Sequence, residues 1–216
     1  MHARNTVLTV MMCLALLSAC AGGGSGGPTA LDAGQAEAVL PDSVSVPGWE
    51  TRLGPVAYPL KKAKATGLAR CLHEGPQDSC ARVRFFGASS FHRQHGPVVT
   101  FFLQTYRDEA SARSSYGAAW KQWRSGVPGA KPMSAGKLGD QQDAVVGLSS
   151  SAVPGSKGVM IVVRAGSVIM LSAAESGTRV KMADSFLTRF ADMFAKRAEE
   201  AQADKTPSAA VESSIG

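Results

Sequence analysis

Three stretches of this chain are apolar at consecutive positions, a pattern typical of strands that are buried on both faces. They are Phe85-Phe86, residues 101–103 and residues 159–163, and they are rich in β-branched or aromatic side chains. Successive side chains of a strand point to opposite faces, so such a sheet needs cover on both sides. Long helices can cover one face. The other face must be covered by an apolar ligand, by a partner, or by the chain's own residues 35–72. We favour cover by residues 35–72.

Strands and helices are predicted to alternate in two similar blocks. Residues 82–87 and 98–106 read as antiparallel strands, and a helix follows the N-cap Asp108 with one apolar face. That face consists of Ala112, Tyr116, Ala119, Trp120 and Trp123. Three further strands precede a final helix over about residues 177–198, whose stripe includes Val180, Ala183, Phe186, Leu187, Phe190, Met193 and Phe194. This ββα-βββα order predicts an α+β fold, an antiparallel β-sheet packed by two long amphipathic helices.

The N-terminus begins with a short apolar stretch that follows His2 and Arg4. Residues 7–17 are too few to span a bilayer, which takes about 20 apolar residues. The stretch ends in Leu17-Ser18-Ala19-Cys20, which resembles the lipobox of bacterial lipoproteins. The resemblance implies cleavage before Cys20 and a thioether-linked diacylglycerol, with acyl chains such as palmitate, on that cysteine. A plain signal peptide that happens to end in a cysteine is the alternative.

These features divide the chain into four parts. Residues 1–19 are the signal peptide, residues 20–34 a lipidated flexible tether rich in glycine, residues 35–198 a single α+β domain, and residues 199–216 a disordered tail without apolar periodicity. The lipid anchor implies localisation on the extracytoplasmic face of the cell membrane, which the protein contacts through its diacylglycerol.

The cysteines fit such a compartment. With Cys13 removed and Cys20 acylated, Cys71 and Cys80 remain in an oxidising space, and Gly75-Pro76 can turn the chain between them. We therefore expect a disulfide, which stabilises the fold by about 2.5 to 3 kcal/mol on the chain-entropy model. A zinc site of both cysteines with His73 would lack a fourth ligand.

The net charge of +6 is unevenly distributed. Residues 50–96 carry three acidic side chains and eight lysines and arginines, which include Lys61, Lys62 and Lys64. Such a stretch attracts anions. For a protein held on a membrane, the nearest polyanions are lipid headgroups and wall polymers, so we exclude nucleic acid as a partner. Solvated surface lysines are the simpler interpretation.

No motif in the chain indicates catalysis. His92 and His95 fall in a predicted turn, no serine stands in Gly-x-Ser-x-Gly, and the glycine run at residues 22–27 is not a phosphate loop. We therefore expect no enzyme activity, no cofactor and no metal site. A polar cleft holding either histidine beside a carboxylate would indicate the opposite.

The mature chain resembles small actinobacterial lipoproteins and extracytoplasmic sensor-like domains, including those attached to receptor Ser/Thr kinases. Shared features are Leu40-Pro41-Asp42, Pro47-Gly48-Trp49, the cysteine pair, Leu138-Gly139-Asp140 and residues 163–168. The resemblance implies a helix-on-sheet domain that binds or senses a ligand outside the cell.

Two functions follow as expectations. The first is a non-enzymatic, ligand-binding or sensor-like lipoprotein whose apolar small ligand contacts Phe85, Phe86, Phe101 and Phe102. The second is an accessory or scaffold protein of a membrane or cell-wall complex. It would contact a cell-envelope protein through Trp49 or the basic residues 61–70.

Overall fold

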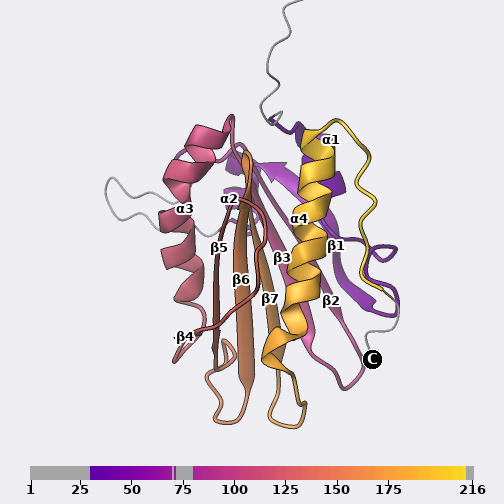
Figure 1. Cartoon of the computed structure of the whole chain (residues 1–216), viewed down its shortest axis with the longest axis vertical. Coiled ribbons are helices and arrows are strands. Elements are labelled where there is room, and N and C mark those ends of the chain that lie inside the picture. The colour runs from indigo at the N-terminus through magenta and orange to yellow at the C-terminus, as the bar shows by residue number, and fades with distance from the viewer. Residues whose placement is uncertain (1–29, 70, 72–79, 213–216) are drawn as a thin grey trace, which may run out of the picture.

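The computed structural model describes residues 30–69, 71 and 80–212, which form one seven-stranded antiparallel sheet with helices on both faces (Figure 1). The strands are β1 Glu50–Pro59, β2 Phe85–His92, β3 Val98–Thr105, β4 Lys131–Pro132, β5 Gln141–Gly147, β6 Lys157–Ala165 and β7 Val168–Ser176. The helices are α1 Ala33–Val39, α2 Leu60–Ala65, α3 Glu109–Arg124, the short 3-10 helix η2 Asp184–Leu187 and α4 Thr188–Gln202. The prediction of an α+β fold with an antiparallel sheet is confirmed.

The order of the strands in the sheet is β1-β2-β3-β7-β6-β5-β4, so the two blocks of the sequence meet where β3 pairs with β7. Sequential hairpins make most of the other pairings, and the β6–β7 hairpin turns at Gly166, whose φ of +52° favours glycine. The chain also carries the short elements α1, α2 and β4, so the element order is longer than the ββα-βββα pattern.

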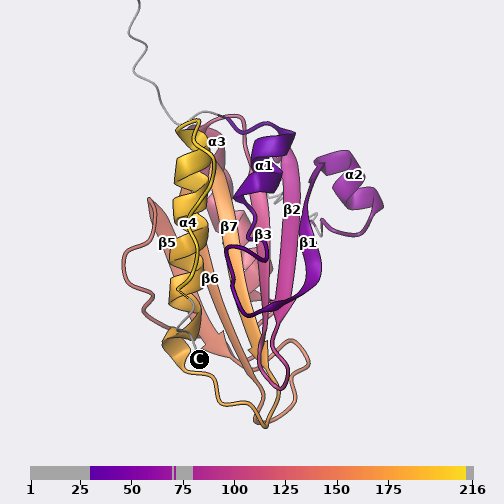
Figure 2. The same ribbon diagram turned by 90° about the vertical axis from the view of Figure 1, so that its right-hand side faces the viewer.

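Each face of the sheet has its own buried cluster. The first cluster lies under α4 and α1 and includes Phe101, Phe190 and Phe194, and Figure 2 shows these two helices on the same side of the sheet. The second lies under α3 and includes Tyr116 and Trp123. Residues 35–72 contribute to both clusters, because Leu40, Val46 and Trp49 join the first and Ala63 and Ala69 join the second. The chain therefore covers both faces of its own sheet.

Helix α3 begins where the sequence predicts. The Asp108 side chain accepts a hydrogen bond from the backbone N–H of Ser111 at 2.7 Å. Hydrogen bonds from the side chain and the backbone of Ser111, together with one from Arg107, lower the pKa of Asp108 to about 2. The final helix begins later than predicted, because residues 177–183 are not helical. Lys157 holds this segment by donating to the Met182 carbonyl at 2.6 Å and by pairing with Asp184.

The C-terminal segment corrects the prediction of a disordered tail over residues 199–216. Helix α4 continues to Gln202, whose buried amide bonds the backbone of Ser167 and Ala165. Residues 203–212 then run back along the helix, where the Val211 N–H donates to the Ser45 carbonyl at 2.9 Å and the side chain of Val211 is 7% exposed. Hydrogen bonds to the backbone of this segment, the Glu200 carboxylate that Ser208 and Ala209 bind, and the buried Val211 side chain therefore order the tail, and composition reveals none of them. Residues 213–216 lie outside the described part.

The domain also begins earlier than the predicted boundary at residue 35. Leu31 is fully buried, and Asp32 and Gln35 form a capping box that starts α1 at Ala33. The tether predicted over residues 20–34 is therefore shortened by these residues, and residues 1–29 lie outside the described part.

The predicted disulfide between Cys71 and Cys80 is confirmed, with 5.6 Å between the two Cα atoms. Within residues 30–69, 71 and 80–212, no helix is long and apolar enough to cross a membrane.

Candidate functional site

The four phenylalanines predicted to contact a ligand lie on opposite faces of the sheet. Phe86 and Phe102 lie on the α3 side with 6.0 Å between their ring centroids. Phe85 and Phe101 lie on the α4 side, where the ring of Phe101 is 5.3 Å from that of Phe194. Because Phe85-Phe86 and Phe101-Phe102 are consecutive in their strands, their side chains must diverge.

Two of these rings lie within the cores, and the rings of Phe85 and Phe102 are partly buried and pack against them. Phe101 is fully buried and Phe86 is 2% exposed. None of the four lines any of the three hollows described below. The structure therefore gives no support to a ligand site at these rings, and their apolar character is explained by cover from both sides.

The largest of these hollows is an open groove of about 870 Å³ at one end of the sheet. It is lined by Trp49, by residues of the β2–β3 turn between Arg93 and Pro97, by residues 134–136, and by residues between Lys181 and Arg189 at the start of η2 and α4. We call it the end groove. Its volume lies within the range of about 300 to 1,000 Å³ that is usual for small-ligand sites.

Trp49 connects the end groove to the core. Its ring is 5.4 Å from Phe190 in an edge-to-face arrangement and 6.1 Å from Phe186, which lines the groove. The preceding Gly48 adopts a φ of +78°, which turns the chain so that Trp49 enters the core just before β1. The Arg93 guanidinium covers the ring, with 4.9 Å from Cζ to the ring centroid.

The charged side chains that line the end groove are all basic: Arg93, Lys181 and Arg189. Within the described part of the chain, none of the three forms an ion pair. The Nε atom of Arg93 is buried and has no hydrogen-bond partner among the described residues. Three cations without an ion-pair partner among the described residues give the groove a positive charge that attracts anions.

The acidic side chains nearest in sequence to the groove are engaged elsewhere. Asp184 pairs with Lys157, and Glu50 lies 3.3 Å from Nε2 of His92. His92 thus stands beside a carboxylate, but neither histidine of the predicted turn lines the groove. The arrangement can hold a ligand by charge and apolar contact. The described residues contain no group of three or more histidine, cysteine or acidic side chains that could hold a metal ion.

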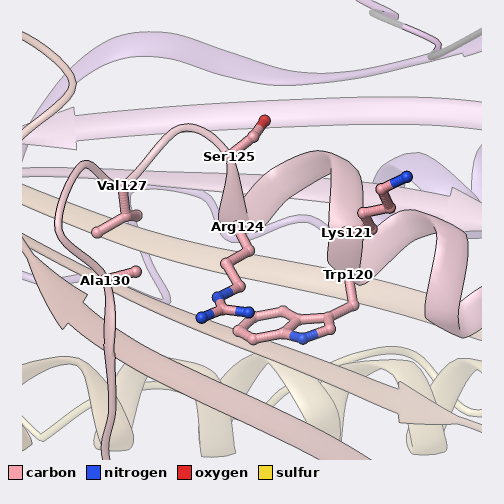
Figure 3. Close-up of a pocket in the computed structure, with 6 residues that line it drawn as sticks. All are labelled: Trp120, Lys121, Arg124, Ser125, Val127 and Ala130. Carbon is pink, nitrogen blue, oxygen red and sulfur yellow. The ribbon is translucent and has the colours of Figure 1, made fainter.

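A second hollow, of about 380 Å³, lies at the C-terminal end of α3. Trp120, Lys121 and Arg124 of α3 line it, as Figure 3 shows. It presents a smaller aromatic and basic surface on the other face of the sheet.

A third hollow, of about 360 Å³, lies beside Arg197 and Asp42. The Arg197 guanidinium donates to the carbonyls of Val39 at 3.1 Å and Ala209 at 3.1 Å, so its donors bind the fold together. Burial lowers the pKa of Arg197, and the charges of Asp42 and Glu200 oppose that shift. The arginine at this hollow therefore holds α1 and the C-terminal segment against α4.

Sequence reasoning identified Trp49 and the basic character of residues 50–96 but did not single out the cations of the groove. Lys181 and Arg189 come from a segment far from Arg93 in the sequence, and no periodic pattern joins them. Only the fold brings the β2–β3 turn beside the start of α4.

Comparison with known proteins finds no matching family model and no matching curated protein. Among solved structures, the chain is similar to the extracellular domain of PknH from Mycobacterium tuberculosis, with 9% sequence identity and a TM-score of 0.46. The match covers 83% of this chain and 100% of that domain. At this level of similarity we transfer no function from PknH.

Proposed function

We propose that this chain is a non-enzymatic, lipid-anchored lipoprotein on the extracytoplasmic face of the cell membrane, and that it binds a ligand in the end groove. The observation that supports this most strongly is the meeting of Arg93, Lys181 and Arg189, all without an ion-pair partner among the described residues, around a groove of about 870 Å³. Unpaired cations gathered from separate segments are more than a solvated face requires.

The position of the groove suits a protein that is anchored by Cys20. Arg84, just before β2, donates to the Leu31 carbonyl at 3.3 Å, so the first described residues lie near the start of that strand. Arg93 follows the other end of β2, and eight strand residues span about 26 Å. Figure 1 shows α1 at the top of the molecule and the β2–β3 turn at the bottom. The groove thus faces away from the end at which an N-terminal anchor would attach.

Native mass spectrometry of the protein purified from its own membrane tests ligand binding in the groove. Ser185 is exposed and lines the groove, so Ser185→Trp should fill part of it without entering the core. Wild type should retain a non-protein ligand, and Ser185→Trp should lose it. Ala110→Trp adds the same side chain at an exposed position of α3 and should retain the ligand. Equal occupancy in all three proteins, or no ligand in wild type, would contradict binding in the groove.

Surface contact with an envelope protein is the second candidate function. It is favoured by the filled cores and by the exposed Trp120 and Arg124 hollow on α3, since Trp and Arg are enriched in protein interfaces. Cross-linking in cells from a probe placed at Lys121 should capture a protein if this function holds. Capture from Ser185 alone would favour the groove instead.

A further inference from the structure

The charge and shape of the end groove indicate what kind of ligand it takes. We infer that the ligand is a segment of an anionic glycan or polyol polymer of the cell envelope, with repeated phosphate or carboxylate groups. This inference rests on the proposed function, because it names the ligand class of the same groove.

One cation of the groove, Arg93, is held in place by a contact within the fold. Arg93 is fixed over Trp49 at 4.9 Å, so its guanidinium is oriented before a ligand arrives. Guanidinium groups bind phosphate and carboxylate through paired N–H donors, and the described residues give the Arg93 side chain no acceptor. Lys181 and Arg189 stand on a different segment, so the three charges suit several anionic groups spaced along one ligand.

The groove is too large and too apolar for a free inorganic anion. Pro97, Met182 and Phe186 also line the groove, and the space of about 870 Å³ accommodates several sugar-sized units. Apolar side chains contact the carbon faces of sugar or polyol units, while the arginines and the lysine bind their anionic groups. This combination of apolar and basic side chains fits an anionic polymer better than an acyl chain, which would leave the cations unpaired.

The location favours an envelope polymer over the bilayer. Leu31 and the groove lie near opposite ends of β2, about 26 Å apart along the strand, so the groove lies at the end of the domain remote from the first described residues. Anionic headgroups attract basic surfaces only within about a Debye length. Wall polymers extend beyond that distance.

Titration calorimetry of the full-length protein in neutral detergent tests the inference. The probes are poly(glycerol phosphate), polygalacturonate, the neutral polymer dextran, and glycerol 3-phosphate, the free headgroup of an anionic lipid. We expect one or both anionic polymers to bind, the choice between them showing whether phosphate or carboxylate is preferred, and we expect affinity to fall as salt rises. Arg93→Gln and Arg189→Gln should each weaken binding about tenfold, the lower end of what a charged hydrogen bond contributes.

Two variants provide matched controls. Lys61→Gln removes a charge from α2, which lies beyond the far end of β1, and Arg124→Gln removes the arginine beside Trp120. Neither should change affinity more than twofold. Loss of binding in Arg124→Gln but not in Arg93→Gln would overturn the inference, as would equal binding of dextran, or binding of glycerol 3-phosphate as tight as that of the polymers. If Ser185→Trp abolishes binding of a retained ligand while Arg93→Gln does not, the groove binds a neutral ligand, so the proposed function survives and this inference fails.

Discussion

The guanidinium of Arg93 lies over the indole of Trp49, with 4.9 Å between Cζ and the ring centroid. This contact joins the β2–β3 turn to the core, because the other neighbours of Trp49 are Phe186 and Phe190. Phe190 in turn lies 6.3 Å from Phe101 on β3. A chain of aromatic contacts therefore runs from the end groove into the sheet.

Phe190→Ala should lower the free energy of unfolding by about 3 to 5 kcal/mol, because this fully buried ring contacts Trp49, Phe101 and Phe186. Lys196→Ala, on an exposed position of the same helix, should change it by less than about 0.5 kcal/mol. Urea denaturation gives both values. Equal effects would show that α4 does not pack through this face.

Removing residues 205–216 should lower the melting temperature by more than about 4 °C, a shift that corresponds to roughly 1 kcal/mol in a domain of this size. The deletion removes the buried Val211 side chain and the carbonyl of Ala209 that accepts from Arg197. Scanning calorimetry measures the shift. Glu212→Ala, at an exposed position, serves as the control, and an unchanged melting temperature after the deletion would mean that the tail does not dock.

Docking of the tail should weaken in acid. Burial raises the pKa of Glu200, but hydrogen bonds from Ser208 and Ala209 outweigh burial and lower its pKa below the usual 4.5. The folded state therefore binds this proton less readily than the unfolded state, so the contribution of Glu200 is complete above pH 4.5 and is lost as pH falls through the lowered pKa.

Glu200→Gln removes this titration. The difference in melting temperature between wild type and Glu200→Gln should be largest near neutral pH and should shrink as pH falls below 4.5. A difference that stays constant across this range would show that the Glu200 carboxylate does not hold the tail.

Cys20→Ala should release the protein from membranes, because the proposed acyl chains are the anchor that the sequence provides. Fractionation in high salt is the measurement, since salt also removes proteins that are held only by charge. Retention of Cys20→Ala as firm as that of wild type would contradict the lipoprotein assignment.

Much of the fold could be predicted because its signals are local and periodic. The apolar face of α3 contains Tyr116 and Trp123, both buried as expected, and the stripe of α4 contains Phe190 and Phe194, both fully buried. Asp108 marks the start of α3 in the sequence and caps it in the structure.

The ends of the domain could not be predicted in this way. Leu31 and Val211 are single apolar residues in polar surroundings, and their burial depends on docking against distant segments. Arg197 binds the carbonyls of Val39 and Ala209, which are contacts to backbone that no side-chain pattern records.

The candidate site was harder to predict from the sequence than the ends of the domain. Consecutive phenylalanines indicated a ligand, whereas their alternation between the two faces of the sheet gives each ring a place in a core. The end groove combines Trp49 with cations from two other segments, and such a combination exists only once the sheet has formed.

Hydrogen exchange of the wild-type protein in isolated cell envelopes, compared with the same protein purified in detergent, tests binding in the end groove most directly. We predict that the envelopes slow exchange in residues 93–97, 134–136 and 181–189, the segments that contain most of the groove's lining residues, and leave α2 and the C-terminal end of α3 unchanged. Slower exchange at α2 or α3 with none at the groove, or identical exchange throughout, would contradict the account.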